Sequence, residues 1–390
     1  FKPIRVLKGT VLFSQTDGML RKGLVVFQFV LSIVLIVGTL IVSKQVNYVQ
    51  QTNLGYDRQN LLYIPLEGEL ANKFELFSHM ALNTPGIHSL SRISTQSPSN
   101  IENQIGGVFW EGKDPNETPM FTQAATGYDF VKTLDLKLLQ GRDFSRNFVS
   151  DSTGYIINEA ALKIINYKNP IGRPLTQWGK KGTIIGVLKD FHYTSLHEPI
   201  KPLIIRMAPA SNYGSALIRT EPGKTSQALA GLEKISKTLN PKYSFTWSFS
   251  NEEYQRLYKS EQVVNRLSNA FAALAIFISC MGLLGLTMFT AERRAKEMSI
   301  RKVLGASVAV LFMLLSGEFI LLVLLALVIA IPIAWFSMND WLLNFAYRIH
   351  MEWWIFGLAG AMAILIALAT VSFQAIKGAM VNPIKSLRSE

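Results

Sequence analysis

The sequence predicts a membrane protein in which an α-helical four-span bundle carries a large α+β extracytoplasmic domain between spans one and two. Three observations predict this fold class. The chain has 390 residues, of which 49% are hydrophobic and only 17% are charged. Four long stretches contain no charged residue, and the interval between the first two, residues 44–266, has an ordinary globular composition. The average composition therefore combines a membrane part with a globular part.

The four uncharged stretches are the candidate membrane spans: residues 23–43, 267–291, 319–339 and 353–376. Each is long enough to cross about 30 Å of hydrocarbon at about 1.5 Å per residue. A buried helix of a soluble protein would show a polar stripe at this length, which disfavours that alternative. No small-x-small cleavage pattern follows the first stretch, so we interpret it as a retained anchor rather than a signal peptide.

The distribution of Lys and Arg predicts the orientation. Five basic residues lie in residues 1–22, five between spans two and three and three in the tail 377–390, but the short loop 340–352 has one. The rule that cytoplasmic loops are positive therefore places both termini and residues 292–318 in the cytoplasm, and the loop 340–352 outside. An aromatic belt is predicted at the outer interface, formed by Trp335, Trp341, Phe345, Tyr347, Trp353 and Trp354. The net charge of +12 then faces anionic membrane lipid, so it gives little support to nucleic-acid binding.

Two β-α-β units are predicted in the inserted domain. Their strands and helices are expected at residues 61–66, 71–82 and 87–95, and again at 215–220, 225–239 and 243–249. Between them, a strand at 155–158, a helix at 159–165 and a strand at 183–188 are expected. The ends of the domain could form a short antiparallel stalk from residues 44–53 and 252–267, with an apolar seam of Tyr254, Leu257, Val264 and Phe271. The alternative is that these two segments are frayed helix ends that do not form a stalk.

A charged stretch, residues 291–307, separates spans two and three. Glu292 with Lys296, Arg293 with Glu297, and Glu297 with Arg301 stand four apart, which predicts a helix with paired charges. Gly305 is suited to end that helix, and Ser307 to cap the next. A loop whose positive charge only fixes the orientation of the spans would explain the basic residues, but it would not require the charges to be paired four residues apart.

The residues from Glu292 to Ser307, ERRAKEMSIRKVLGAS, resemble the coupling-loop signature of the FtsX-like, MacB-like ABC transporter permeases. Met298 and Ser299 stand where Ile and Gly are expected. The resemblance implies a site that docks on a separate cytoplasmic ATPase, formed by Glu292, Arg293, Arg294, Lys296, Glu297, Arg301, Lys302, Gly305, Ala306, Ser307, Val308, Leu311, Phe312 and Leu315. It also implies a MacB-like periplasmic core domain, with a membrane-proximal lobe at about 58–98 and 214–250 and an inserted outer lobe at about 99–213.

The helix after this loop is too long for one straight span. Residues 308–337 would extend for about 45 Å, and Ser316-Gly317-Glu318 interrupts the apolar run. We therefore expect a bend there, with Ser307 to Leu315 lying along the inner membrane face. Its exposed side would present Val308, Leu311, Phe312 and Leu315 to a groove on the ATPase. Glu318 is expected at headgroup depth or paired with Arg301 or Lys302.

Residues 2–8, KPIRVLK, are similar to residues 382–388, NPIKSLR. The family often closes its permease unit with such a motif, so we expect the chain to be the C-terminal half of a duplicated, eight-span permease. Otherwise it would act as a homodimer.

The sequence contains no convincing catalytic site. Gly223-Lys224-Thr225 resembles part of a nucleotide-binding loop, but Ile218 stands where its first glycine would be. His192 and His197 lack the spacing of a metal motif, and no hydrolase signature is present. We expect no catalytic residue, no metal and no cofactor, with ATP bound by the partner subunit.

The predicted function is that of a permease subunit in a bacterial inner membrane. It would couple ATP hydrolysis by a partner to movement of the extracytoplasmic domain, and so export or extract an amphiphilic cargo such as a peptide, lipoprotein or antibiotic. The alternative is a non-transporting, FtsX-type regulator of a cell-wall hydrolase or sensor kinase. The expected partners are the ATPase, a second permease half, membrane lipid and a periplasmic adaptor, with no nucleic acid.

Overall fold

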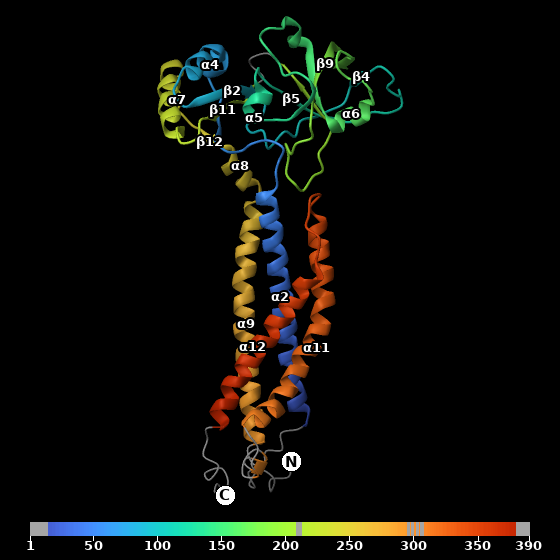
Figure 1. The fold of residues 1–390 in the computed structure, drawn as a ribbon, viewed down its shortest axis with the longest axis vertical. Coiled ribbons are helices and arrows are strands. Elements are labelled where there is room, and N and C mark those ends of the chain that lie inside the picture. Colours follow the sequence, from blue (N-terminus) through green and yellow to red (C-terminus); the bar gives the residue numbers. More distant parts are fainter. Residues whose placement is uncertain are drawn as a thin grey trace, which may run out of the picture. The chain divides into compact units, whose positions relative to one another are not determined.

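The computed structural model describes residues 15–207, 213–294, 297, 300–301, 304 and 308–379 (Figure 1). The chain forms two compact units. We call them the membrane unit, which comprises Phe1–Tyr48, Ser260–Asn344 and Arg348–Glu390, and the inserted domain, which comprises Val49–Lys259 and Phe345–Tyr347.

The membrane unit consists of long helices: α2 (Gln15–Gln51), α9 (Lys259–Arg293), α11 (Val308–Leu343) and α12 (Trp353–Ala379). Within the described part of the chain, these four are long and apolar enough to cross a membrane. The helices contain the four uncharged stretches of the sequence. The predicted bundle of four spans is therefore confirmed.

The helix α11 differs from the expectation of a separate interfacial segment. It runs without interruption from Val308 to Leu343, through Ser316-Gly317-Glu318 and past Pro332. Glycine in a helix costs only about 1 kcal/mol relative to alanine. That cost is too small to break a helix with long apolar runs on both sides of the glycine.

The core of the membrane unit is built around α2, whose buried side chains include Val25, Phe29, Ile33, Val37 and Ile41. Small residues line the contact between α11 and α12. On α11 these are Ala326, Ala330 and Ala334, and on α12 they are Ala359, Ala363 and Ala367. Because lipid tails are as apolar as the helices, such contacts depend on close van der Waals packing, which small residues permit.

The inserted domain contains two sheets. The first has the order β12-β1-β11-β2 and consists of β1 (Leu61–Pro65), β2 (Ile87–Ile93), β11 (Ser215–Thr220) and β12 (Ser248–Phe249). Three helices cover one of its faces: α3 (Glu69–Asn72), α4 (Phe74–Leu82) and α7 (Thr225–Leu239) (Figure 1). Strand alternation directs Leu62, Ile64 and Ile218 into this core.

The second sheet has the order β3-β5-β10-β7-β9-β8-β4, and β6 pairs with β9. Its strands are β3 (Gln104–Ile105), β4 (Val108–Trp110), β5 (Phe121–Ala125), β6 (Leu138–Gly141), β7 (Gly154–Asn158), β8 (Pro174–Gln177), β9 (Lys180–Leu188) and β10 (Leu203–Arg206). The helices α5 (Phe130–Leu134) and α6 (Glu159–Ile165) and a 3-10 turn (Val149–Thr153) accompany it. The last element of the domain is α8 (Ser250–Leu257).

Two of the predicted elements differ in the structure. The strand expected at 243–249 is reduced to Ser248–Phe249, and the helix expected at 71–82 is divided at Lys73 into α3 and α4. The strand is short because it pairs only with Leu62 and Tyr63 of β1 at the edge of the sheet. The division at Lys73 occurs where the backbone leaves helical geometry, at φ −98° and ψ 22°.

The face of the first sheet that points away from α4 and α7 is buried but polar. Arg219 of β11 lies there with 11% of its side chain exposed. Its guanidinium donates to the Thr133 carbonyl at 2.7 Å, to the Gln59 carbonyl at 2.8 Å and to both a side-chain and a backbone oxygen of Asp57 at 3.0 and 2.9 Å. A buried charge with this many partners holds the chain around residues 57–60 and 133 against the sheet.

Arg219→Met should destabilise the inserted domain by about 3 kcal/mol, because it leaves three carbonyls and a carboxylate without their donor. The matched control is Arg146→Met, which removes a half-exposed ion pair to Glu75 at 3.0 Å and should cost less than about 1 kcal/mol. Urea unfolding of the full chain in detergent, followed by pulse proteolysis, measures both. Equal losses in the two variants would contradict this role of Arg219.

Candidate coupling site

The structure describes part of the predicted coupling site. Glu292 and Arg293 lie at the end of α9, Arg294 follows directly, and Glu297 and Arg301 are helical. The backbone of residues 308–315 forms the first turns of α11. Lys296, Lys302, Gly305, Ala306 and Ser307 lie outside the described residues.

One predicted charge pair is present. Arg301 donates to Glu297 at 2.8 Å, one helical turn away, and both side chains are about half exposed. Arg293 was expected to pair with Glu297, but its guanidinium lies 5.6 Å from the centre of the Phe289 ring. The helical spacing of the charges is thus confirmed for Glu297 with Arg301, and Arg293 packs back on its own helix.

Glu318 joins three helices. One carboxylate oxygen accepts from Arg294 at 2.5 Å, and the other lies 3.6 Å from the ammonium of Lys22 on α2. The sequence instead suggested Arg301 or Lys302 as a partner. The observed pairing follows from topology, because spans that alternate in direction bring the start of α2, the end of α9 and the start of α11 to the same end of the bundle. We call Lys22, Arg294 and Glu318 the charge cluster.

Above this cluster, side chains of α2 and α9 meet repeatedly. Arg21 lies 4.2 Å from the centre of the Phe289 ring, and Ser32 and Ser279 share a buried hydrogen bond of 2.9 Å. Nearer the inserted domain along the chain, Ser43 donates to Asn265 at 2.7 Å. As the residue number rises along α2 it falls along α9, so the two helices are antiparallel neighbours over this whole length.

Gly282 supplies a further contact between the same helices. A Cβ atom at this position would overlap the Oε1 atom of Gln28 on α2, so a larger residue would require that side chain to move. Gly285, one turn further along α9, has open space around it. On the side of α9 that faces α2, the glycine at position 282 therefore leaves room for the Gln28 side chain.

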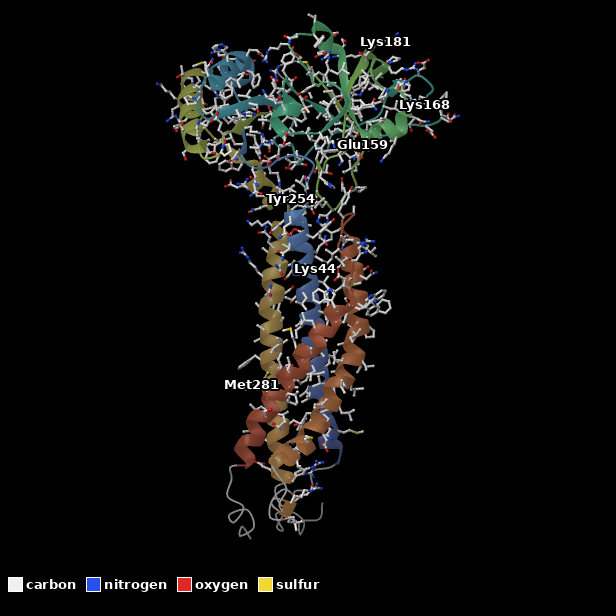
Figure 2. The ribbon with its side chains drawn as sticks, viewed as in Figure 1. Lys44, Glu159, Lys168, Lys181, Tyr254 and Met281 are labelled. Atoms are coloured by element: carbon white, nitrogen blue, oxygen red, sulfur yellow. The ribbon has the colours of Figure 1, made fainter. Side chains whose placement is uncertain are left out.

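The predicted apolar seam of the stalk is wrong. Val264 and Phe271 have exposed fractions of 42% and 55%, whereas Ala272, Ala275 and Ser279 are buried. Met281, labelled in Figure 2, is also on the exposed side of α9. For Phe271, which lies in span two, the reason is that lipid accepts large apolar side chains at no cost, so small and polar residues face the neighbouring helix instead. Tyr258 also separates α8 from α9, so the segment before span two is not one helix.

At the other end of the membrane unit, α2 contacts the segment just before α12. Lys44, labelled in Figure 2, lies 3.0 Å from Glu352, and its ammonium lies 5.3 Å from the Trp354 ring. The backbone N–H of Ile349 donates to the side chain of Gln45 at 2.9 Å. These contacts fix the turn between α11 and α12 to α2.

The middle of that turn belongs to the inserted domain. Ala346 donates to the His197 carbonyl and Tyr347 to the Leu196 carbonyl, each at 3.2 Å. The Phe345 ring stacks on His197 with 4.1 Å between the ring centres. Sequence reasoning placed Phe345 and Tyr347 in an aromatic belt, but they pack on the domain.

The two histidines that suggested a metal site are packed against aromatic rings. Tyr347 meets His192 edge to face at 4.5 Å, and burial lowers the pKa of His192. Among the residues that the structure describes, no cluster of three or more His, Cys, Asp or Glu side chains could hold a metal ion.

Comparisons with known proteins agree with this architecture. Residues 269–383 match the FtsX-like permease C-terminal family model. The chain is 22% identical over 190 residues to the macrolide export ATP-binding/permease protein MacB of Aggregatibacter actinomycetemcomitans, covering 46% of this chain and 30% of that protein. It is 20% identical over 244 residues to MacB 2 of Aeromonas hydrophila, covering 57% of this chain and 37% of that protein. The chain thus spans about a third of the length of the curated relatives it matches.

Solved structures of lower similarity include the periplasmic region of MacB from Actinobacillus actinomycetemcomitans. That structure is 18% identical, with a TM-score of 0.37, and the match covers 53% of this chain and 97% of that one. The extracellular domain of the noncanonic ABC-type transporter YknZ is 17% identical, with a TM-score of 0.33, and the match covers 48% and 96%.

The family model covers α9, α11 and α12, and the curated relatives are ATP-binding/permease proteins. With four membrane helices and a large α+β domain between the first two, the chain is similar to FtsX-like, MacB-like ABC transporter permeases, and residues 269–383 match the FtsX-like permease C-terminal model.

Proposed function

We propose that the chain is a permease subunit that couples ATP hydrolysis by a separate cytoplasmic subunit to movement of the inserted domain. The observation that carries the proposal is the pairing of α2 with α9. Both helices reach from the charge cluster to the inserted domain without a break, and polar contacts join them along the way.

The length of these helices supports a role in transmitting motion. The 37 residues of α2 extend for about 55 Å, well beyond an apolar core of about 30 Å. A displacement at one end of such a helix is carried to the other end, because the intrahelical hydrogen bonds resist compression. The charge cluster ties the receiving ends of α2 and α9 to the start of α11.

Two of the buried polar contacts in the described part of the bundle are closed pairs. Ser32 and Ser279 bond to each other, and the side chain of Gln45 accepts from a backbone N–H. A cargo that enters from the side or from outside the membrane suits this arrangement. We therefore propose an amphiphilic cargo, such as a peptide, a lipoprotein or an antibiotic, that is exported or extracted from the membrane.

The proposed partners follow from the same mechanism. The ATPase would dock on residues 292–315 in the cytoplasm, where both termini would also lie, and a second permease half or a second copy would complete a symmetric transporter. A periplasmic adaptor would extend it, and the bacterial inner membrane would hold it. The curated relatives are named as macrolide export proteins that combine ATP-binding and permease parts. In this proposal the ATP-binding part is a separate chain.

Leu311→Glu combined with Phe312→Glu should abolish co-purification of the ATPase while the protein still inserts into the membrane. Both residues lie in the first turns of α11, on the helix side proposed to enter the ATPase groove. The matched control is Val310→Glu with Met313→Glu, which places the same charges on the opposite side of the same turns, where both native residues are exposed. The measurement is affinity purification from membranes. Normal ATPase binding by the first variant would refute the docking role.

Gly282→Val should weaken the coupling of the inserted domain to ATP turnover, because the new side chain displaces the Gln28 side chain from the contact between α2 and α9. Gly285→Val is the matched control, with open space around the same new side chain. The measurement is the change in deuterium uptake of residues 49–259 when ATP is added to the assembled complex. We expect Gly282→Val to lose most of that change and Gly285→Val to keep it, and equal behaviour would contradict the coupling path.

A further inference from the structure

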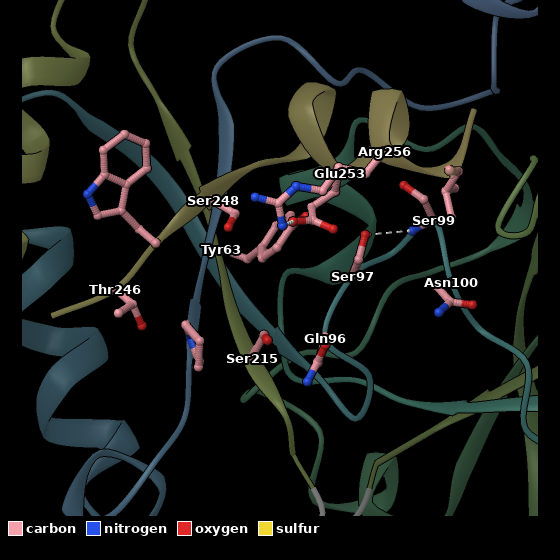
Figure 3. A pocket seen from close by; sticks show the side chains of 13 residues that line it. Tyr63, Gln96, Ser97, Ser99, Asn100, Ser215, Thr246, Ser248, Glu253 and Arg256 are labelled. Atoms are coloured by element: carbon pink, nitrogen blue, oxygen red, sulfur yellow. Dashed lines mark hydrogen bonds and ion pairs between the residues drawn. The ribbon is translucent and has the colours of Figure 1, made fainter. Parts of the chain in front are cut away.

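A cavity of about 290 Å³ lies in the inserted domain (Figure 3). Its floor is the polar face of the first sheet, opposite the face covered by α4 and α7. The segment of residues 96–100 and the helix α8 form its walls. The coupling mechanism uses none of these residues.

Two hydroxyl groups on the floor have no hydrogen-bond partner among the described residues. Tyr63 and Ser215 have exposed fractions of 5% and 1%, and neither Tyr63 Oη nor Ser215 Oγ forms a hydrogen bond within the described chain. Tyr63 stands opposite Leu217 and Ser215 opposite Pro65, so the two residues are diagonal neighbours on one face of the β1–β11 pair. An unpaired buried hydroxyl destabilises the folded protein, and a ligand that bonds to it in the cavity would remove that penalty.

The wall holds further hydroxyls in fixed positions. Ser97 and Ser99 are buried, the backbone N–H of Ser99 donates to Ser97 Oγ at 3.2 Å, and Ser99 shares a hydrogen bond of 2.8 Å with Tyr56. At the rim, the amide side chains of Gln96 and Asn100 are exposed. Hydroxyls and amides both donate and accept, so this lining suits a ligand with many groups of the same kind.

The cavity carries no unbalanced charge. Its acid and its base, Glu253 and Arg256, pair with each other at 2.6 Å. The indole of Trp247 is 38% exposed at the rim and offers an apolar ring face beside the polar floor. An anionic or cationic ligand would find no free counter-charge here, whereas a neutral ligand with one polar and one apolar face would match the lining.

We propose that this cavity binds an uncharged, polyhydroxylated ligand of the size of a mono- or disaccharide. Its volume stands at the lower end of the range for small-molecule sites, about 300 Å³, which admits one or two sugar rings. The ring hydroxyls bond to Tyr63, Ser215 and the amides, and the C–H face of a sugar lies on Trp247. This site is additional to the proposed coupling function and does not depend on it.

The experiment uses the full chain in lipid nanodiscs and three probes: maltose, cellobiose and N,N′-diacetylchitobiose. Isothermal calorimetry should show saturable binding of at least one of them. Tyr63→Phe and Ser215→Ala should each weaken that binding at least tenfold without lowering the Tm, since each removes a hydroxyl that the protein itself leaves unpaired.

Ser89→Ala is the matched control. Ser89 is 3% exposed and its hydroxyl is likewise unpaired on the same sheet face, but it stands opposite Arg219, outside the cavity lining. It should leave sugar binding unchanged. If a floor variant failed to fold, Trp247→Ala at the exposed rim would serve instead, with an expected loss of at least fivefold.

Three results would overturn the proposal: no saturable binding of any of the three disaccharides, equal weakening by Ser89→Ala and the floor variants, or tighter binding of a trialanine peptide than of every disaccharide. The last result would assign the cavity to peptides. These outcomes are independent of ATPase binding, so they do not bear on the coupling function.

Discussion

Hydrogen-bonding side chains of α2 and α9 meet at intervals along the apolar region, and the rest of the molecule is arranged around that contact. Ser32 with Ser279 and Ser43 with Asn265 are polar pairs that hydrocarbon could not satisfy. Separating the two helices would leave these groups without partners, so the pair is held together even though large apolar residues of α9 point elsewhere. In the proposed mechanism, force would pass along this pair of helices.

Besides α2 and α9, the chain connects the membrane unit and the inserted domain in one further segment. Phe345–Tyr347, in the turn between α11 and α12, are part of the inserted domain. They are held by backbone hydrogen bonds to Leu196 and His197 and by aromatic stacking. This short segment between α11 and α12 is therefore part of the inserted domain as a compact unit.

The sequence was most informative where hydrophobic patterning decides the structure. The four spans, the helix at residues 225–239 and the strand at 215–220 were predicted from uncharged runs, periodicity and flanking turn residues. Short strands of the second sheet, such as Gln104–Ile105 and Val108–Trp110, were missed because two or three residues carry no measurable alternation. Their position depends on partners far away in the sequence.

The candidate site was predicted only in part, for a related reason. The spacing of Glu297 and Arg301 is local and could be recognised. The contacts of Glu318 with Lys22 and Arg294 depend on how three helices come together, and nothing in the spacing specified them. The stalk seam failed because the soluble coiled-coil rule, apolar side chains inward, is reversed where the surroundings are lipid. Buried hydroxyls such as Tyr63 and Ser215 have no sequence signal at all.

In the proposed mechanism α2 and α9 move as one body, and a covalent lock between them tests this most directly. Ser32→Cys and Ser279→Cys in a Cys280→Ala background place two thiols where the native hydroxyl oxygens are 2.9 Å apart. The measurement is the ATP-dependent change in deuterium uptake by residues 49–259 in the assembled complex, before and after oxidation. If α2 and α9 move as one body, the oxidised protein should keep the full ATP-dependent change in deuterium uptake. Loss of the change on oxidation, with recovery on reduction, would show that the helices slide past each other and would contradict the account.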